Sequence, residues 1–384
     1  GDDGVYHYSG NLCIEDVELW WPHTHGEQPL YETTILVKLE DTELTASFEP
    51  LGFRSFRWRN LNAALDGSGE PASDFGLDVN GVAVFCRGAC WTPINIQSPA
   101  VTDAEYREAL RVLRDAGVNM LRVSGTFFYE QESFYRLCDE LGILVWQDFM
   151  FARLAYPFED DNFLKNVIVE VEQVLARLRS RSAVAILCGN TEVEQQAAML
   201  GLPLEAEQHS FFRDTLAEIC RRMAPQCEYW PSSPAGGELP FQINRGVSHY
   251  FGVGGYRRPL EDAHVTEPLF ASECLALSNV PENRGLAAFL PEHRTLPTDP
   301  GYKAGVPRDV GTGWDFADVT DHYIESIFNV DTRKLRYEDP QRYLSLARVT
   351  SGEIMATVMG YWRRQSSPCN GAMIWFLRDL EFGA

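Results

Sequence analysis

The sequence lacks several features that would each point to a particular class of protein. No stretch reaches the roughly 20 consecutive apolar residues of a membrane-spanning helix, so a membrane protein is not indicated. The nine cysteines include neither a C-x-x-C pair nor a Cys/His cluster with zinc spacing, which argues against a disulfide framework and against a zinc site. No repeat with a period of about 20–50 residues is visible, which argues against a solenoid.

Positive charge is also scarce. The 384 residues include 33 Lys and Arg against 55 Asp and Glu, which gives a formal net charge of −22. Because nucleic acids and anionic membrane surfaces are polyanions, they would repel such a chain, and we expect neither as a partner. A neutral or cationic ligand fits better. The 9 Trp, 15 Tyr and 22 Phe include rings that can pack on the flat faces of sugars, although most should belong to the core.

The N-terminal part of the chain favours β-structure. Two alternating, β-branched segments, YETTILVKLED and ELTASFEPLGFRSFRW, are separated by a short polar turn. We expect residues 1–62 to form a partial immunoglobulin-like β-sandwich, since a full domain takes about 100 residues. The Gly- and Ser-rich residues 63–74 are expected to be a linker. The first residues, GDDGVYHYSG, lack a signal-peptide pattern, and we expect the chain to begin partway through a larger protein.

Residues 75–384 alternate between short apolar strands and helical stretches. The expected strands are 82–90, 118–125, 143–150, 183–190, 227–233, 246–252, 268–273 and 371–377. Eight strands with helical or irregular crossovers predict an α/β fold, a (β/α)8 TIM barrel, which we expect to stop shortly after its eighth strand. An open doubly wound sheet is the alternative, but no Gly-rich phosphate-binding loop follows a strand.

Local motifs support this division into elements. Asn80-Gly81 lies between two short apolar runs and predicts a tight β-hairpin. Thr102, followed by Glu105, predicts a capping box at the start of a helix. Gly142 follows EQESFYRLCDEL and is expected to end that helix.

Two glutamates occupy strand ends in the predicted barrel. Functional groups of such barrels lie at the C-terminal ends of the strands. Glu192 follows the fourth expected strand and Glu273 ends the seventh. Two facing carboxylates suit glycoside hydrolysis, in which one protonates the leaving oxygen and the other attacks the anomeric carbon or activates water. Either acid alone could be a helix-terminal or ion-paired residue, but the pair favours catalysis.

Several segments together resemble glycoside hydrolase family 2 in its β-mannosidase-like branch. They are LWWPHTHGEQPLY, LGFRSFR, VNGVAVFCRGACWTP, NMLRVSGTFFYEQESFYRLCDELGILVWQDFMF, CGNTE, YWPSSP, SHYFGV, FASE and GAMIWFLRDL. The resemblance implies a retaining exo-β-glycosidase that acts on terminal β-linked sugars, foremost β-mannosides, without a metal or organic cofactor. In it Glu192 matches the general acid/base and Glu273 the nucleophile. The implied partners are a carbohydrate substrate and further domains of the same polypeptide.

The resemblance also implies residues around the sugar. Arg122 is expected to brace Glu273, with an ion pair to Asp148 as the alternative. Tyr250 is expected to hydrogen-bond the nucleophile, and Trp375 to form the floor under the sugar ring; each could instead be a core residue. The role of His249 is left open between catalysis and packing.

Four positions depart from the family pattern near the sugar. Thr191 replaces the usual Asn before the acid/base, Ser124 replaces a Trp, Asn95 replaces an Asp, and Leu200 aligns with a Trp. We still expect Asn95, Asn190 and Thr191 to contact the substrate. A threonine offers a shorter contact than the usual Asn, so the glycone can differ from mannose.

Three functions therefore stay open. A β-mannosidase-like hydrolase is the first. A hydrolase of another glycone is the second, including an exo-β-glucosaminidase, since an acidic protein attracts an amino sugar. The third is a carbohydrate-binding relative that has lost its chemistry.

Long excursions at 197–226 and 278–336 are expected to fold over the barrel mouth and favour exo action, with Trp314 either contacting a leaving sugar or packing the loop.

Overall fold

The computed structural model describes residues 10, 12–39, 42–59, 75–202, 210–290 and 296–380. Its centre is an eight-stranded parallel sheet in the order β10-β9-β8-β7-β6-β13-β12-β11. The strands are β6 (Cys86–Cys90), β7 (Met120–Val123), β8 (Leu144–Asp148), β9 (Val184–Cys188), β10 (Glu228–Trp230), β11 (Val247–Tyr250), β12 (Phe270–Cys274) and β13 (Gly371–Ile374). Each lies within or overlaps a strand expected from the sequence.

The pairing of the first and last parallel strands decides between the two candidate folds. β6 pairs with β13 in parallel, with Cys86 opposite Gly371. An open doubly wound sheet has no such pairing, whereas a sheet that curls on itself requires it. Between β10 and β11 an isolated antiparallel bridge joins Ala235 to Val247 through backbone hydrogen bonds of 3.0 and 2.9 Å. The curled sheet is therefore consistent with the predicted TIM barrel.

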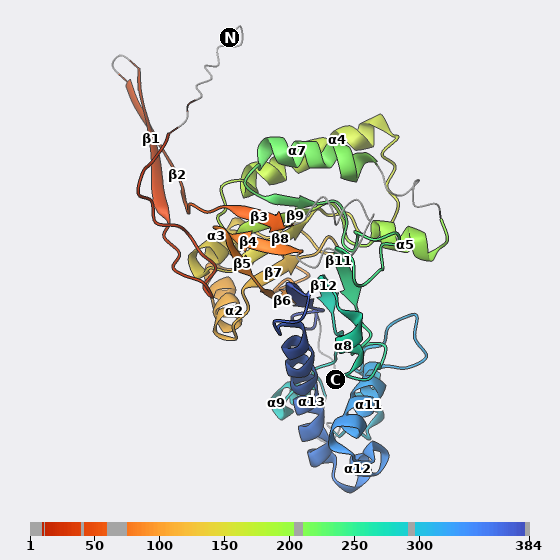
Figure 1. The fold of residues 1–384 in the computed structure, drawn as a ribbon. Helices are drawn as coiled ribbons and strands as arrows, with labels where there is room; N and C mark the ends of the chain where they lie inside the picture. The colour runs from red at the N-terminus through yellow and green to blue at the C-terminus, as the bar shows by residue number, and fades with distance from the viewer. Residues whose placement is uncertain are drawn as a thin grey trace.

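Helices surround the curled sheet (Figure 1). Those on the first half of the chain are α2 (Asp103–Asp115), α3 (Glu132–Leu141), α4 (Asp161–Leu178), α5 (Val193–Met199), the π-helix η1 (Phe211–Thr215) and α7 (Leu216–Met223). Those on the second half are α8 (Asp262–Thr266), α9 (Asn283–Phe289), α10 (Pro300–Ala304), α11 (Phe316–Phe328), α12 (Thr332–Glu338) and α13 (Pro340–Trp362). Figure 1 shows α9, α11, α12 and α13 gathered in a lobe beside the barrel. A separate apolar cluster that includes Leu286, Tyr302, Ile324 and Tyr343 forms the core of this lobe. Across the described residues, every helix is too short or too polar to cross a lipid bilayer.

The three local motifs are confirmed. β4 (Gly76–Val79) and β5 (Val82–Val84) pair antiparallel around Asn80 and Gly81. Both turn residues have positive φ, 50° and 79°, as a type I′ hairpin turn requires. Thr102 and Glu105 form the reciprocal capping box of α2, and Gly142 ends α3 with a φ of 68°.

The N-terminal part forms small antiparallel sheets. β1 (Tyr31–Leu39) and β2 (Thr42–Leu51) make a ribbon that projects from the body of the molecule (Figure 1). β3 (Phe56–Arg59), which the sequence placed in the sandwich, pairs instead with β4. Two packed sheets of a sandwich are not seen among the described residues, and the expected linker at 63–74 lies outside them.

The sheet of β3, β4 and β5 closes one end of the barrel through Trp58. This side chain is almost fully buried, and its ring centroid lies 5.6 Å from that of Trp146, 6.1 Å from Trp230 and 5.4 Å from Phe270. Phe270 is the first residue of β12, so the sheet covers the end of the barrel where the strands begin. The opposite end, where functional groups are expected, stays open.

Chain segments before β3 hold the turn that leads into β9. The Ser182 hydroxyl accepts a hydrogen bond from the Gly52 backbone at 2.6 Å, and Arg54 donates to the Ser182 carbonyl at 2.8 Å. The indole of Trp20 donates to the carbonyl of Asp139 at 2.8 Å. The Asp139 side chain is buried at this junction and accepts from the Ala183 backbone at 2.7 Å.

The burial of Asp139 makes stability depend on pH. Burial raises the pKa of Asp139 to about 7, against the opposing effects of the Ala183 hydrogen bond and Arg181. The folded protein therefore binds more protons than the unfolded chain between roughly pH 4 and 7, so stability is full below this window and falls as pH rises through it. We expect Asp139→Asn to remove up to about 4 kcal/mol of this pH dependence. Urea unfolding of the unmodified protein and of Asp139→Asn at pH 5 and pH 8 measures this difference. The same change in unfolding free energy between the two pH values in both proteins would contradict the prediction.

Candidate active site

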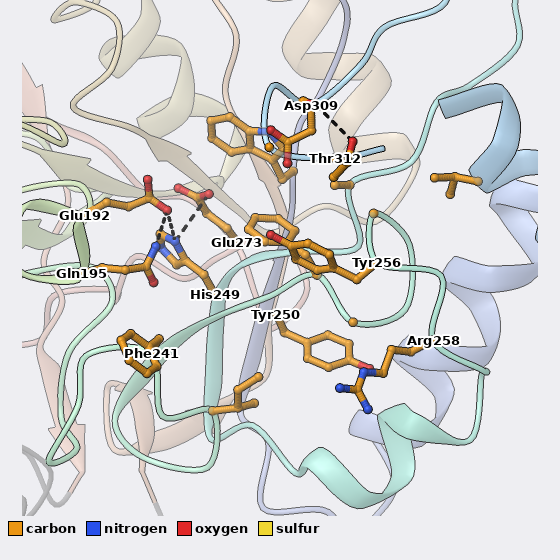
Figure 2. A pocket seen from close by; sticks show the side chains of 18 of the residues that line it. Glu192, Gln195, Phe241, His249, Tyr250, Tyr256, Arg258, Glu273, Asp309 and Thr312 are labelled. Atoms are coloured by element: carbon orange, nitrogen blue, oxygen red, sulfur yellow. Dashed lines mark hydrogen bonds and ion pairs between the residues drawn. The ribbon is translucent and has the colours of Figure 1, made fainter. Parts of the chain in front are cut away.

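A cavity of about 1220 Å³ opens where the strands end. Four of the eight residues predicted for the site lie on its wall: Glu192, Tyr250, Glu273 and Trp375. Figure 2 shows the two glutamates side by side, with His249 reaching toward both. Both carboxylates are nearly inaccessible to solvent, so whatever charge they carry is balanced by protein groups.

The turn after β9 places Glu192 at the cavity. A side chain at Gly189 would put its Cβ only 2.2 Å from the Pro231 carbonyl oxygen, so only glycine lets the two segments approach. The amide oxygen of Asn190 accepts from the Val193 backbone at 3.1 Å and fixes the start of α5. Glu192 itself has a φ of 63°, an uncommon conformation for a non-glycine residue that concentrates at functional sites.

β12 supplies Glu273, and Arg122 of β7 holds it. The Arg122 guanidinium, fully buried, donates to the Glu273 carboxylate at 2.8 Å and to that of Asp148 at 2.7 Å. Both roles weighed for Arg122, the brace and the ion pair with Asp148, are therefore present. One buried cation serves two carboxylates, which fixes the position of Glu273.

Four of the eight predicted residues lie off the cavity wall. Arg122, Asn190 and Thr191 are buried behind the carboxylates and support them. The Thr191 hydroxyl donates to Asp148 at 2.5 Å and accepts from the Gly125 backbone at 2.9 Å, so protein groups already occupy it. Asn95 is exposed and accepts from the backbone of Gln97 and Ser98. Direct contact of these four side chains with a sugar stays a prediction.

The remaining two departures from the family pattern, Ser124 and Leu200, lie in different surroundings. Ser124 is buried, and its hydroxyl lies 3.2 Å from that of Thr191, so the two substitutions touch. Leu200 is 75% exposed after the end of α5, while Met199 and Gln196 line the cavity instead.

His249 lies between the two glutamates. Its Nδ1 is 3.0 Å from Glu192 Oε1 and 3.6 Å from Glu273 Oε2. Glu192 is held further by the amide of Gln195, which donates at 2.8 Å, and by the guanidinium of Arg153 at 3.2 Å. Each carboxylate therefore has its own cation, and the imidazole serves both.

The electrostatic environments of the two glutamates differ. Burial acts to raise the pKa of Glu192, but the hydrogen bond and charge of His249, with Arg153, outweigh it and lower this pKa to about 2. Burial raises the pKa of Glu273, and the attraction of His249 and Arg122 offsets this only in part. In the empty site Glu192 is thus the better anion, so a role as proton donor requires a source of the proton beside it.

The expected hydrogen bond from Tyr250 to the nucleophile is wrong. The Tyr250 hydroxyl donates to Asp262 at 2.8 Å, and its ring packs against Trp362 with centroids 5.4 Å apart. Successive side chains of a strand point to opposite faces. Because His249 of β11 points toward the carboxylates, its neighbour Tyr250 points toward the helices.

Four further residues of the wall, three from loops and one from α5, were missed in the sequence. They are Arg153, Gln195, Tyr256 and Asp309. Gln195 follows Glu192 by three positions at the start of α5, a spacing that could have revealed it. Tyr256 follows a turn at Gly254 with a φ of 100°, and it lines the cavity (Figure 2). Arg153 and Asp309 carry no spacing signal.

The second expected excursion does reach the cavity. Arg308, Asp309, Thr312 and Trp314 line it. The Trp314 indole also donates to the Gly255 carbonyl at 2.9 Å, so this side chain both packs the loop and faces the cavity. Most of the first excursion has no place on the wall among the described residues.

Glu192, His249 and Glu273 form the one group of possible metal ligands found among the described residues. One ligand atom from each lies within 4.8 Å of the other two, and imidazole and carboxylates are common ligands of Zn²⁺. Two guanidinium groups already neutralise these carboxylates, which weakens a cation site. The expectation that no metal is needed stays a prediction.

The comparisons with known proteins first define the class. No model of a known protein family matches the chain. The crystal structure of the β-D-mannosidase of Dictyoglomus thermophilum is similar over 97% of this chain and 44% of that one, with a TM-score of 0.81 and 29% identity. The exo-chitosanase of Amycolatopsis orientalis, 14% identical over 94% of this chain and 41% of its own, has a TM-score of 0.66 and shows the fold alone. By this comparison the chain is similar in fold and in sequence to a glycosyl hydrolase.

The curated relatives narrow the similarity to one kind of glycosyl hydrolase. The β-mannosidase B of Aspergillus flavus is 29% identical over 95% of this chain and 43% of its own length, and that of Thermothelomyces thermophilus is 27% identical over 96% and 44%. The chain is therefore β-mannosidase-like, as its resemblance to glycoside hydrolase family 2 implies. It spans less than half the length of these relatives.

Proposed function

We propose that this chain carries the active site of a retaining exo-β-glycosidase, with Glu192 as general acid/base and Glu273 as nucleophile. The observation that carries the proposal is the short separation of the two buried carboxylates: one oxygen of each lies within 4.8 Å of the other. Retaining enzymes hold their carboxyl groups about 5–5.5 Å apart, whereas inverting enzymes need about 6.5–9.5 Å for a water molecule.

The surroundings support these two roles. Glu273 lines the cavity and is held by the ion pair with Arg122, which supports a nucleophile in a fixed position. Glu192 lies on the side of Arg153, whose side chain is half exposed, so a leaving group there can depart to solvent. The loop residues Arg308 to Trp314 narrow the mouth and favour removal of one terminal sugar at a time.

The proposed glycone is a β-mannoside, because the curated relatives that match nearly the whole chain are named β-mannosidases. One observation favours a second candidate, an amino sugar. The cavity wall carries five acidic side chains (Glu192, Asp262, Glu273, Asp309 and Asp315) against three arginines (Arg153, Arg258 and Arg308). Asp309 on the mouth loop is exposed and lines the cavity, so it can attract the cation of an amino sugar.

A panel of 4-nitrophenyl glycosides tests the proposal. We expect hydrolysis of the β-mannoside in preference to the glucoside, galactoside, glucuronide and glucosaminide, with EDTA having no effect. The first product seen by proton NMR should be the β-anomer. Formation of the α-anomer would overturn the retaining assignment, preference for the glucosaminide would support the second glycone, and no hydrolysis of any substrate would favour a carbohydrate-binding relative.

The β1–β2 ribbon is proposed to belong to the immunoglobulin-like unit of residues 1–62 that the sequence predicts. Ile35, Leu36, Leu44 and Phe48 are each about half exposed on it. Such apolar side chains on a two-stranded ribbon favour packing against further strands, since a lone hairpin is marginally stable.

A further inference from the structure

His249 belongs to a chain of hydrogen bonds that runs away from the cavity. Its Nε2 lies 3.1 Å from the Ser233 hydroxyl, which lies 2.7 Å from the Ser272 hydroxyl. Ser272 donates to the backbone carbonyl of Ser248 at 3.4 Å. With the contact from Nδ1 to Glu192, four links join the Ser248 carbonyl to the Glu192 carboxylate. We call this set the His249 chain.

The number of protons that this chain needs can be counted. A carbonyl and an ionised carboxylate only accept, so each end of the His249 chain is an acceptor. Four links therefore require four donated protons between them. The two serine hydroxyls supply one each, and a neutral imidazole supplies one, which makes three. Only a chain with one additional proton satisfies every link.

That additional proton has two places to sit. If it is on Nδ1, His249 is an imidazolium that donates to Glu192 and to Ser233. If it is on Glu192, the carboxylic acid donates to Nδ1, and all other links keep their direction. The two arrangements differ only by movement of one proton across the 3.0 Å contact from Nδ1 to Oε1. Because the chain is buried, an unsatisfied link would be costly.

We propose that His249, oriented by Ser233 and Ser272, stores the catalytic proton and passes it to Glu192, which delivers it to the leaving group. This role rests on the proposed glycosidase function. His249 is thereby a positioning residue, since it acts through Glu192 rather than on the sugar.

The proton balance over one reaction cycle is closed. In the first step Glu273 forms a bond to the anomeric carbon, the glycosidic C–O bond breaks, and the leaving oxygen takes the proton from Glu192. Glu192 receives the Nδ1 proton of His249, so the pair is left as an ionised carboxylate and a neutral imidazole. In the second step water attacks the anomeric carbon, Glu273 leaves, and the proton released by water returns through Glu192 to His249.

The charges around His249 are consistent with both states. Glu192 at the start of α5 and Glu273 on β12 face the ring, and both favour an imidazolium. Arg153 after β8 and Arg122 on β7 reach these carboxylates and oppose it. Asp148 shares Arg122 with Glu273, so the network holds three carboxylates and two guanidinium groups, which one additional proton balances. Hydrogen bonding, which the serines control, then decides where this proton sits.

Nitrogen-15 NMR of histidine-labelled protein tests the storage state without any substrate. The His249 signals are those that vanish in His249→Asn. We expect both ring nitrogens to be protonated at pH 7, and the second proton to be lost more readily in Ser272→Ala, which lacks one acceptor of the chain. Ser233→Ala should act likewise if Ser272→Ala fails to fold. Ser248→Ala is the matched control, because its hydroxyl bonds the Phe270 carbonyl and lies outside the chain.

A neutral His249 at pH 7 in the unmodified protein would overturn the proposal, as would identical titrations of Ser272→Ala and the unmodified protein. This readout needs no hydrolysis, so it judges the His249 chain even if no glycoside is cleaved, in which case the proposed function alone fails.

The leaving group provides the kinetic test. An Asn at position 249 can still donate near the position of Nδ1 but cannot store a proton. We expect kcat/KM of His249→Asn to fall about 10²-fold or more on a phenyl glycoside, whose departure needs an acid, and less than about 10-fold on a 2,4-dinitrophenyl glycoside. The alkaline limb of the pH profile should move to lower pH. Equal losses on both substrates with an unchanged profile would show a merely structural role.

Discussion

We expect Glu273→Gln to abolish nearly all of the proposed glycoside hydrolysis while the protein stays folded. The amide is the same shape as the carboxylate but cannot attack an anomeric carbon, so we expect kcat to fall on the order of 10⁴-fold or more. Glu273 is buried, and burial raises its pKa, so the folded protein already pays to ionise it. The neutral variant should therefore be as stable as the unmodified protein, or more so.

The size of this stability effect depends on pH. With the pKa of Glu273 raised in the folded state, the stability contributed by its protonated form is full at low pH and is lost as pH rises through the folded pKa. The glutamine of Glu273→Gln does not ionise, so the variant keeps this contribution at every pH. Its excess free energy of unfolding over the unmodified protein should therefore grow from pH 4 toward pH 7. Thermal melting at both pH values measures this directly.

A buried glutamate outside the cavity offers a matched control. Glu194 lies two residues after Glu192, is equally buried, and contacts Arg213 at 3.4 Å rather than the cavity. Glu194→Gln should keep turnover within a few-fold of the unmodified protein. If Glu273→Gln retains turnover, or if both variants lose it equally, Glu273 is not the nucleophile.

The sequence predicts the barrel strands well because their signal is local. Apolar runs of four to eight residues bounded by turn residues place all eight parallel strands. The expected strand 82–90 is in fact two strands, β5 and β6, which separate at Phe85 and enter different sheets. Residue preferences alone do not say which partner a strand takes. β3 is a second example, because its Trp58 packs against Trp146 of the barrel and the strand therefore pairs with β4 rather than joining a sandwich.

The site is only partly readable for a related reason. The rule that functional groups follow strand ends identifies Glu192 and Glu273 from chain order alone. It does not say which of two neighbouring side chains on β11 reaches the carboxylates, and here it is His249 rather than Tyr250. Loop residues such as Arg153 and Asp309 reach the wall through long-range packing, which no periodicity encodes.

The departures from the family pattern are also explained in part by the structure. Thr191 and Ser124 touch one another behind the carboxylates, so the two substitutions form one packing unit rather than two separate changes at the sugar. The hydroxyl of Thr191 is bound to Asp148, which is bound to Arg122. These substitutions are therefore linked to Glu273 through Asp148 and Arg122.

Arg122→Met should produce the largest loss of stability at this site. The guanidinium is fully buried and is the cation shared by Asp148 and Glu273, at 2.7 and 2.8 Å. Removing it leaves two buried carboxylates without their cation, and breaking a buried pair in this way costs about 3–5 kcal/mol. Arg122→Lys keeps the charge but not the fork that contacts both acids, so we expect an intermediate loss.

Urea unfolding at pH 5 and pH 7 separates this effect from lost packing. Protonation of the two stranded carboxylates relieves their cost, so the deficit of Arg122→Met should shrink at the lower pH. Arg153→Met is the control, because its side chain is 54% exposed beside Glu192 and an exposed pair contributes at most about 1 kcal/mol. A deficit that is small, or equal in the two variants, would show that Arg122 does not hold Glu273. A large deficit confined to Arg122 would show that the same ion pairs that orient Glu273 also hold β7, β8 and β12 together, so that Glu273 could not be moved without loosening the barrel.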